Sequence, residues 1–355
     1  MATDRNDRLA IALAGCGSAG MHHGEEIVAG GDWRLAAVCD VQEDLAAAAA
    51  KELGVERVYT GFDKMVQEEE LDAVAIITPA HVHVRQIEAA AAMKVHCLCE
   101  KPLGITVDEC ERAVSACKDA GVLLGVTYTY RFVPDFRILR EWVDRGEIGD
   151  VREVRWLKYG GRPADPRPDP PPELPDHHQL AKIMHLFDCG VHAFDLMRWF
   201  AGDPVVAVSG SATAPGPGWE PTDVTLVFTY AGGQRGVFDM GAMTAVPGCD
   251  NGQPSISFLV IGTEGSIAWD YRGGWRKRQT RTSITAHTAA GSREKEIPAY
   301  DKCRDVQYAE FARGVRTGSL PPHWPTGAQA VEATKNGLDA VAAVRGNTVH
   351  VCDYV

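Results

Sequence analysis

The feature that most constrains this fold is the alternation of short apolar runs with helical stretches over the first third of the 355-residue chain. Strands that alternate with helices at this spacing form parallel βαβ units. We therefore predict an α/β fold whose N-terminal domain, residues 1–127, contains a doubly wound parallel sheet. The apolar runs predict strands at 9–15, 33–40, 71–79, 95–102 and 122–129, and the stretches between them predict helices at 19–30, 43–53, 83–93 and 106–121.

The pattern changes after residue 128, and we assign residues 128–355 to a second, C-terminal α/β domain. Its strand-like runs, punctuated by glycine, predict a mostly antiparallel sheet that begins with a strand at 148–159. Segment 160–176 is too rich in proline for a helix or a central strand. This segment is either a surface excursion or subunit-contact arm, or a loop that borders the active site. A helix that contains residues 187–197 follows it.

The net charge and the cysteines limit which binding partners and which cellular compartment we expect for this protein. The formal net charge of −12 argues against a nucleic acid or an anionic membrane as partner, because their phosphates would be repelled. The first apolar run is too short for a signal sequence, and no later segment is long enough to span a bilayer. The ten cysteines are scattered without a CxxC pair, so we expect reduced thiols in a cytoplasmic protein.

The residues AGCGSAG follow the first predicted strand and open the first predicted helix. Gly15, Gly17 and Gly20 form a GxGxxG pattern, which permits a tight turn and the close approach of a pyrophosphate. The beginning of the helix, at Ser18 and Ala19, supplies unpaired N–H groups that favour an anion. We therefore expect this loop to bind a dinucleotide.

An acidic residue, Asp40, ends the second predicted strand, twenty positions after Gly20. Its carboxylate can accept hydrogen bonds from the ribose hydroxyls of an adenosine, and it would repel a 2′-phosphate. We therefore expect NAD in preference to NADP as the cofactor. The alternative is that Asp40 only caps the helix that follows it.

The segment TPAHVH, at 78–83, ends another predicted strand, where a parallel sheet presents its edge to a ligand. Pro79 stiffens the loop there, and we expect this loop, with Thr78 and Pro79, to lie beside the cofactor. His83 could bind the cofactor too, but it fits equally well as a residue of the following helix that has no ligand.

The motif Glu100-Lys101-Pro102 follows a strand at the same sheet edge. Together with the glycine pattern, CD at 39–40 and FDCGVHAFDLMRWFAG at 187–202, it resembles the glucose–fructose oxidoreductase / inositol dehydrogenase (Gfo/Idh/MocA) family. The likeness covers almost the whole chain. It implies a Rossmann domain followed by an α/β domain whose large open sheet forms homodimer or homotetramer contacts. It also implies NAD(P)-dependent hydride transfer at a hydroxyl of a sugar, cyclitol or derivative, with Glu100 and Lys101 beside the cofactor.

The resemblance places the family's catalytic lysine at Lys101, its aspartate at Asp188 and its histidine at His192. A helix would project Asp188 and His192 from one side, because they stand four residues apart. A neutral imidazole at His192 can take the hydroxyl proton near neutral pH, and the ammonium group of Lys101 can stabilise the developing alkoxide. We expect Asp188 to bind a second hydroxyl or to orient the base. Whether His192 or Lys101 moves the proton stays open.

A metal site is the alternative for the same cluster. His185, Asp188 and His192 stand at i, i+3 and i+7, with His177 and His178 upstream. The dinucleotide motifs already give Asp188 and His192 a role, so we expect no metal ion. His185 by itself either packs at the start of the helix or lines the substrate pocket.

Three further residues have both a binding and a structural interpretation. Arg131 could reach the cofactor or the substrate, or it could hold the domain junction through a salt bridge. Tyr128 could line a sugar pocket or pack in the interior. Lys158, on a predicted strand, could contact the substrate or face solvent.

Two other classes of function stay open. An NAD-dependent glycosidase oxidises, eliminates and re-reduces its substrate without net redox, and a regulator of the same fold binds NAD(P) without turnover. Lys101 and His192 argue against a regulator but not against the glycosidase. We expect an NAD-dependent dehydrogenase that acts on a small polyhydroxylated substrate.

Overall fold

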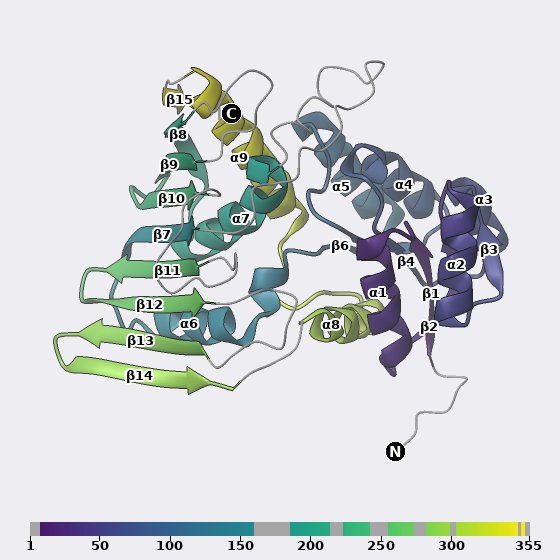
Figure 1. The fold of residues 1–355 in the computed structure, drawn as a ribbon, viewed down its shortest axis with the longest axis horizontal. Coiled ribbons are helices and arrows are strands. Elements are labelled where there is room, and N and C mark those ends of the chain that lie inside the picture. Colours follow the sequence, from purple (N-terminus) through teal and green to yellow (C-terminus); the bar gives the residue numbers. More distant parts are fainter. Residues whose placement is uncertain are drawn as a thin grey trace. The chain divides into compact units, whose positions relative to one another are not determined.

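The computed structural model describes residues 8–159, 185–213, 223–241, 255–272, 282–298, 303–346 and 349–351. The chain packs as two compact units (Figure 1). Unit 1 comprises residues 1–132 and 302–334, and unit 2 comprises residues 133–301 and 335–355. The domain division predicted at 127/128 stays a prediction, and the proline-rich segment 160–176 lies outside the described residues.

Unit 1 contains a six-stranded sheet in the order β3-β2-β1-β4-β5-β6. Every neighbouring pair in it is parallel. The order reverses between β1 and β4, and in open α/β sheets a ligand binds at the carboxyl ends of the strands beside such a reversal. The strands are β1 (Leu9–Ala14), β2 (Trp33–Cys39), β3 (Arg57–Tyr59), β4 (Ala73–Ile76), β5 (His96–Cys99) and β6 (Leu124–Val126).

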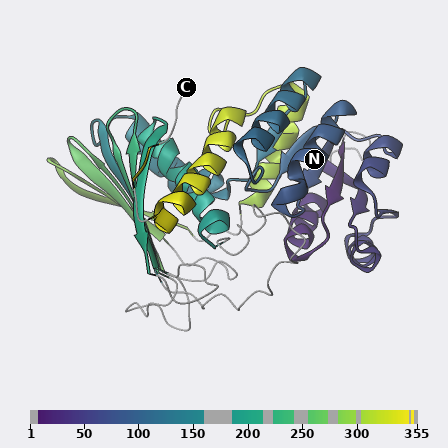
Figure 2. The same ribbon diagram turned by 90° about the horizontal axis from the view of Figure 1, so that it is seen from above.

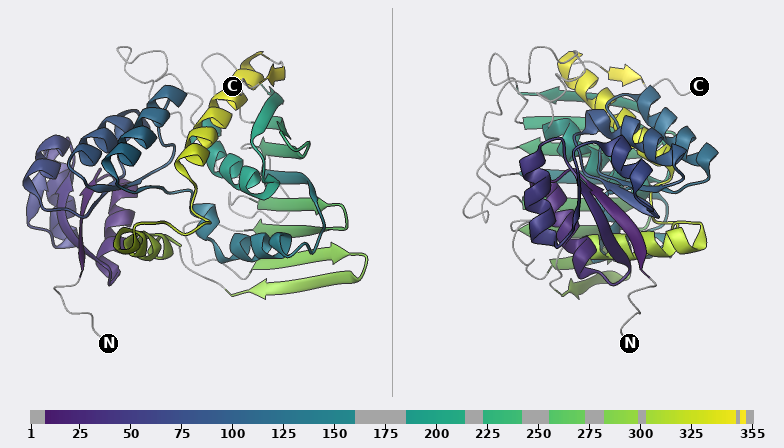
Figure 3. Two further views of the ribbon diagram at one scale, coloured as in Figure 1. Left: turned by 180° about the vertical axis from the view of Figure 1, so that it is seen from behind. Right: turned by 90° about the vertical axis from the view of Figure 1, so that its right-hand side faces the viewer.

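Helices connect these strands, and one further helix comes from the far end of the chain. The helices of unit 1 are α1 (Ser18–Ala29), α2 (Glu43–Leu53), α3 (Phe62–Glu68), α4 (Ala80–Ala92), α5 (Val107–Ala120) and α8 (Arg304–Thr317), with a 3₁₀ turn at Thr129–Phe132. Figures 1 and 3 show α8 beside α1. The indole Nε1 of Trp33 donates to the carbonyl oxygen of Tyr308 over 2.8 Å, which ties α8 to the start of β2.

Unit 2 is built on a nine-stranded sheet in the order β14-β13-β12-β11-β7-β10-β9-β8-β15. Only β7 and β10 pair in parallel; the other neighbouring pairs of this described sheet are antiparallel. The strands are β7 (Val151–Tyr159), β8 (Val205–Ala212), β9 (Asp223–Tyr230), β10 (Arg235–Gly241), β11 (Ser255–Gly262), β12 (Gly265–Arg272), β13 (Thr282–Thr288), β14 (Gly291–Ile297) and β15 (Val349–Val351).

Two helices, α6 (Pro134–Asp144) and α7 (Gly190–Ala201), pack on one face of this sheet (Figure 2). Phe136 of α6 contacts Phe258 edge-on at 5.3 Å between ring centroids, and Phe194 of α7 lies 5.1 Å from Phe238. A π-helical turn, His185–Cys189, precedes α7, and the long helix α9 (Gly327–Gly346) follows α8 along the chain.

The predicted fold class is therefore confirmed: a doubly wound parallel sheet and a second, mostly antiparallel sheet. Strand β3 and helix α3 were not predicted, because they are too short for a clear hydrophobic period; β3 has three residues, of which two are exposed. The helix expected over 187–197 begins as a π-helical turn and continues as α7 to Ala201. None of the helices in the described ranges has the length and hydropathy needed to cross a membrane.

Candidate functional site

The three glycines of the first loop differ in how closely other atoms approach them. Gly15 adopts a φ of +93°, and a Cβ there would lie 2.3 Å from the carbonyl oxygen of Ile77. A Cβ on Gly20 would lie 1.9 Å from the carbonyl oxygen of Gly15, so Gly20 allows α1 to approach the loop. A Cβ on Gly17 would meet nothing within 4 Å. The loop is thus closely packed at Gly15 and Gly20 and open at Gly17.

The open position coincides with the start of α1. Gly17 is the N-cap of the helix, and its residue type supplies no side chain to cap the first N–H groups. Gly17, Ser18 and Ala19 are all exposed. Free N–H groups and the positive end of a helix dipole favour an anion at this place. The loop therefore has the shape and the polarity that a pyrophosphate requires.

Asp40 follows the last residue of β2 and connects three backbone segments. Its Oδ2 accepts a hydrogen bond from the N–H of Cys16 over 2.8 Å, and its Oδ1 accepts one from the N–H of Gln42 over 2.9 Å. The bond to Gln42, the N-cap of α2, agrees with the capping alternative, and the bond to Cys16 ties the carboxylate to the glycine loop. A carboxylate has about four acceptor positions, so two remain for ribose hydroxyls.

The end of β4 carries Thr78, Pro79 and, one turn into α4, His83. The Oγ1 of Thr78 donates to the side-chain oxygen of Gln86 over 2.6 Å, and Pro79 is the exposed N-cap of α4. The imidazole of His83 is buried, with Nε2 at 2.7 Å from the carbonyl oxygen of Thr78 and Nδ1 at 3.0 Å from that of Pro102. His83 therefore connects the two strand-end loops to each other.

Burial lowers the pKa of His83, against the smaller opposing effect of the two carbonyls. A neutral imidazole has one N–H and can donate to only one of the two carbonyls at a time. The structure thus gives His83 a bridging position, and its contact with the cofactor stays a prediction.

The loop after β5 holds Glu100 and Lys101. The Oε2 of Glu100 accepts the backbone N–H of Lys101 over 3.0 Å, and the peptide bond between Lys101 and Pro102 is cis. The backbone N–H of Glu100 donates to the carbonyl oxygen of Ile76 over 2.9 Å. Glu100 and Lys101 therefore lie at the carboxyl end of β5, beside the end of β4, and the side chain of Lys101 is half-buried.

Two residues that sequence reasoning missed form a chain of hydrogen bonds that ends at Glu100. The Oε1 of Glu100 lies 2.9 Å from Nε2 of His23, and Nδ1 of His23 lies 2.8 Å from the hydroxyl of Tyr308. His23 stands three residues after Gly20, inside the predicted first helix, but its relation to α8 cannot be read from spacing. The separation of 285 residues between His23 and Tyr308 leaves no local signal.

Arg131 and Tyr128 are both interior residues of unit 1. Arg131 is 1% exposed, and its Nη1 donates to the carbonyl oxygen of His323 over 3.3 Å and to Oε1 of Gln329 over 3.2 Å. Tyr128 is fully buried. The burial of Tyr128 agrees with its packing interpretation. These two bonds of Arg131 are to neutral groups of unit 1, so the salt bridge at the domain junction stays a prediction, as do cofactor contact by Arg131 and substrate contact by Tyr128.

The predicted catalytic residues of unit 2 lie at the start of α7. His192 is the third residue of this helix; its ring is half-buried, and its Nδ1 is shielded from solvent. Asp188 and His185 belong to the π-helical turn that leads into α7. Their side chains are outside what the structure describes, as are His177 and His178. In the described ranges, no three His, Cys, Asp or Glu side chains are grouped so that they could hold a metal ion.

Lys158 lies near the carboxyl end of β7. Side chains alternate between the two faces of a strand, so Lys158 shares its face with Val154 and Trp156. Those two residues are buried, and α7 packs against β7. Lys158 therefore lies on the helix-covered face, and its side chain is half-buried rather than freely solvated.

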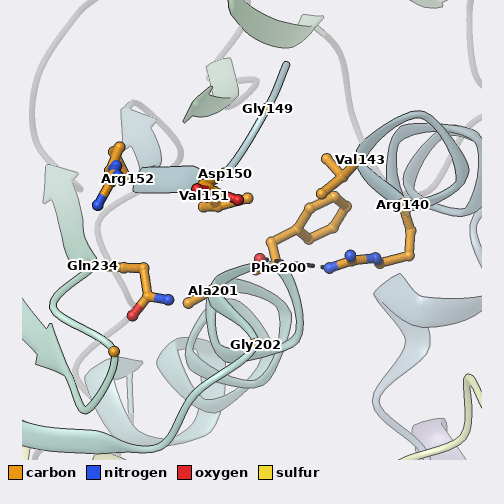
Figure 4. Close-up of a pocket in the computed structure, with 11 residues that line it drawn as sticks. Arg140, Val143, Gly149, Asp150, Val151, Arg152, Phe200, Ala201, Gly202 and Gln234 are labelled. Atoms are coloured by element: carbon orange, nitrogen blue, oxygen red, sulfur yellow. Dashed lines mark hydrogen bonds between the residues drawn. The ribbon is translucent and has the colours of Figure 1, made fainter. Parts of the chain in front are cut away.

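A separate cavity of about 400 Å³ lies at the other end of α7 (Figure 4). Phe200 and Gln234 are among its lining residues, together with Arg140, whose Nη1 donates to the carbonyl oxygen of Trp199 over 2.9 Å. Ala201 stands nine positions after His192 in the helix, which is about 13.5 Å along the helix axis. The cavity is thus not part of the predicted catalytic group.

Two family descriptions match most of the chain. Residues 9–128 match an oxidoreductase family with an NAD-binding Rossmann fold, and residues 136–268 match a GFO/IDH/MocA C-terminal domain.

Named relatives are similar over most of their length. A myo-inositol 2-dehydrogenase of Thermotoga maritima is 29% identical over 88% of this chain and 89% of its own. A scyllo-inositol 2-dehydrogenase (NAD(+)) of Bacillus subtilis is 30% identical over 87% of both chains. The crystal structure of an oxidoreductase from Agrobacterium radiobacter in complex with NAD+, L-tartaric acid and magnesium has a TM-score of 0.79 at 18% identity, and covers 97% of this chain and 98% of that one. This last likeness shows the fold.

Proposed function

Because the chain belongs to the Gfo/Idh/MocA family of NAD-binding oxidoreductases, we propose that it transfers a hydride between NAD and a secondary hydroxyl or ketone of a sugar, cyclitol or sugar derivative. The family identification made from the sequence motifs is confirmed, and the protein is an oxidoreductase. The observation that carries the proposal is the glycine loop: closely packed at Gly15 and Gly20, open at Gly17, and tied to Asp40.

The residues at the end of the parallel sheet fit a dinucleotide. The open backbone at Gly17 and the start of α1 suit a pyrophosphate, and Asp40 keeps acceptor positions for ribose hydroxyls. We propose NAD rather than NADP, because the Asp40 carboxylate would repel a 2′-phosphate. Thr78, Pro79, Glu100 and Lys101 lie at the ends of β4 and β5, where we expect the rest of the cofactor.

When bound, NAD would supply the carbon that accepts the hydride. We assign removal of the hydroxyl proton to Nε2 of His192, because Nδ1 is shielded from solvent. The ammonium group of Lys101 stabilises the negative charge that develops on the substrate oxygen. Asp188 accepts a hydrogen bond from a neighbouring hydroxyl or orients His192, and we propose that His185, Tyr128 and Lys158 contribute to substrate recognition.

The relatives' names favour a cyclitol or sugar as substrate, because the Thermotoga maritima and Bacillus subtilis proteins are both named inositol 2-dehydrogenases. The chemistry of the assigned groups agrees with a small polyhydroxylated molecule: a carboxylate, an imidazole and an ammonium group can each pair with one hydroxyl. The glycosidase is the second candidate, since its first step is the same hydride removal.

An assay with NAD and a panel of cyclitols, sugars and aryl glycosides separates the candidates. Accumulation of NADH supports the dehydrogenase. Cleavage of a glycoside that needs NAD but leaves no NADH supports the glycosidase. Binding of NAD without turnover of any compound in the panel would contradict both enzymatic proposals.

We propose further that the protein is a homodimer or homotetramer. The face of the large sheet opposite α6 and α7 carries half-exposed apolar side chains, among them Leu157, Val237 and Leu259. Strand pairing aligns Val237 and Leu259 on either side of Arg155 in one row. A second copy would bury this row, and light scattering that gives the monomer mass at micromolar concentration would contradict the proposal.

We propose a cytoplasmic location on the basis of the thiols. Eight of the ten cysteines lie in the described ranges, and all eight are thiols rather than disulfides. Such thiols persist in a reducing compartment. Fractionation of cells that express the tagged chain would test this, and recovery outside the cytoplasm would contradict it.

A further inference from the structure

A buried hydrogen-bond chain connects α8 and α1 to the loop that carries Lys101. Its members are the Tyr308 hydroxyl, the His23 imidazole and the Glu100 carboxylate, which accepts the backbone N–H of Lys101. His23 is 0% exposed and Tyr308 is 2% exposed, whereas the Glu100 side chain is 16% exposed. All four residues belong to unit 1, and they come from three separate parts of the sequence.

The direction of each hydrogen bond follows from the bond between the backbone N–H of Lys101 and Glu100. The backbone N–H of Lys101 can only donate, so Oε2 of Glu100 accepts. An ionised Glu100 also accepts at Oε1, which requires the proton of His23 on Nε2. Nδ1 of a neutral His23 is then an acceptor, and the hydroxyl of Tyr308 donates to it. The proton positions are thus defined along the whole chain of bonds.

Burial keeps His23 and Tyr308 neutral. It lowers the pKa of His23, and it raises the pKa of Tyr308 well above its ordinary value. The other charged groups that act on the two residues are Arg304, which opposes ionisation of His23 and favours that of Tyr308, and the side chains of His22 and Glu26. With two neutral members, the negative charge of the chain resides on Glu100.

We propose that His23 and Tyr308 are positioning residues for Lys101, acting through Glu100. This inference rests on the proposed function, in which Lys101 stabilises charge on the substrate oxygen. The side chain of Lys101 is long and flexible, and about 2 kcal/mol of rotamer entropy opposes its ordering. Fixing the backbone N–H of Lys101 fixes the origin of that side chain. A displacement of about 1 Å at such a group can reduce turnover about 100-fold.

The decisive variants change the chain of bonds one member at a time. His23→Leu removes both ring contacts, and Tyr308→Phe removes a single oxygen and leaves the bond between His23 and Glu100. His23→Gln is the conservative rescue, because its amide can donate to Glu100 and accept from Tyr308. His22→Leu is the matched control: it is the adjacent residue of α1, its side chain is 45% exposed, and its ring bonds only weakly to Glu25 at 3.4 Å.

The first measurement does not depend on turnover. Hydrogen exchange at the Lys101 amide should accelerate at least about tenfold in His23→Leu and by less in Tyr308→Phe, because the acceptor on Glu100 is no longer held. His23→Gln and His22→Leu should leave it near the rate of the unmodified protein. Unchanged exchange in both His23→Leu and Tyr308→Phe would overturn the inference, whatever the substrate of the protein is.

The second measurement is steady-state kinetics on a substrate found with the panel of cyclitols, sugars and glycosides. We expect His23→Leu to reduce kcat about 10–100-fold while KM for NAD changes by less than about threefold. The acidic limb of the kcat profile should move to higher pH, because Glu100 loses a donor that favours its ionised form. His23→Gln should restore most of both effects.

The outcomes separate this inference from the proposed function. A Lys101→Ala variant with full activity would contradict the proposed function. An inactive Lys101→Ala variant beside fully active His23→Leu and Tyr308→Phe variants would contradict only the positioning role. Equal losses of kcat, NAD binding and thermal stability without rescue by His23→Gln would also contradict it, because they indicate a purely structural role.

Discussion

The backbone of Gly20 lies directly against the carbonyl oxygen of Gly15, and a Cβ on Gly20 would be only 1.9 Å from that oxygen. Between Gly15 and Gly20 the loop exposes Gly17, where a Cβ would meet nothing within 4 Å. We therefore expect Gly20 to be needed for the packing of the loop and Gly17 for the approach of the ligand. Each role can be tested by adding a single methyl group.

We predict that Gly17→Ala retains the stability of the protein but weakens NAD binding at least about tenfold, because the methyl group occupies the place of the pyrophosphate. Gly31→Ala is the matched control, since a Cβ there also meets nothing within 4 Å. Gly20→Ala should instead lower the thermal midpoint, because its Cβ must displace backbone. Calorimetry and NAD titration measure both effects, and equal NAD affinities for Gly17→Ala and Gly31→Ala would contradict the assignment.

The choice between NAD and NADP should depend on Asp40. We predict that Asp40→Asn raises the ratio of kcat/KM for NADP to that for NAD at least about tenfold, because it removes a like charge beside the 2′-phosphate. Asparagine keeps one acceptor oxygen for the glycine loop or for Gln42. Asp44→Asn, an exposed residue in the first turn of α2, is the control. If the unmodified protein uses both cofactors equally well, the preference for NAD is wrong.

The side chain of Lys101 should act in turnover and contribute little to cofactor affinity. We predict that Lys101→Ala lowers kcat about 10²–10⁴-fold, the range for loss of a group that acts on the reacting oxygen or its proton. The dissociation constant for NAD should change less than about fivefold, because the glycine loop and Asp40 stay intact. The exposed Lys118→Ala on α5 serves as the control. Single-turnover kinetics with NAD titration measure both quantities, and an unchanged kcat would remove Lys101 from the reaction.

Acid should destabilise the protein through two buried histidines. Burial lowers the pKa of both His23 and His83 in the folded state. Below the ordinary histidine pKa of about 6.5, the unfolded chain therefore binds protons that the folded protein does not, and the free energy of unfolding falls by about 1.4 kcal/mol per pH unit for each histidine. At higher pH both states are neutral there, and this contribution is constant.

Urea unfolding measured from about pH 7.5 to pH 5.5 tests this dependence. The slope of the unfolding free energy against pH measures the number of protons taken up on unfolding. His23→Gln should reduce that number by about one near pH 5.5, whereas the exposed His22→Leu should not change it. Unfolding free energies that do not fall toward pH 5.5 would show that these rings are protonated in the folded state.

Local patterns in the sequence were sufficient for the glycine loop and for Asp40, because the tight turn, the start of the helix and the end of the second strand all depend on nearby residues. The same is true of the strands β1, β2, β4, β5 and β6 of the parallel sheet and of the helices α1, α2, α4 and α5 between them. The three residues of β3 and the short α3 have too little hydrophobic period to be recognised.

The partners of Glu100 could not be predicted, for a different physical reason. Tyr308 reaches His23 only because α8 returns to pack beside α1, and no spacing in the sequence encodes that contact. His83 illustrates the same limit. Its position near a strand end left a ligand role and a structural role equally open, and no local pattern indicates that its ring lies between the carbonyl oxygens of Thr78 and Pro102.

The central claim is that a hydride passes from a polyol carbon to NAD with the help of Lys101 and His192. Its most direct test is to incubate the protein with NAD and inositols or sugars deuterated at their carbinol carbons, and to measure deuterium in the nicotinamide nucleotide by mass spectrometry. We predict that the unmodified protein forms deuterated NADH and the matching ketone, and that Lys101→Ala and His192→Ala form almost none. Absence of label with every compound, or undiminished labelling in both variants, would contradict the claim.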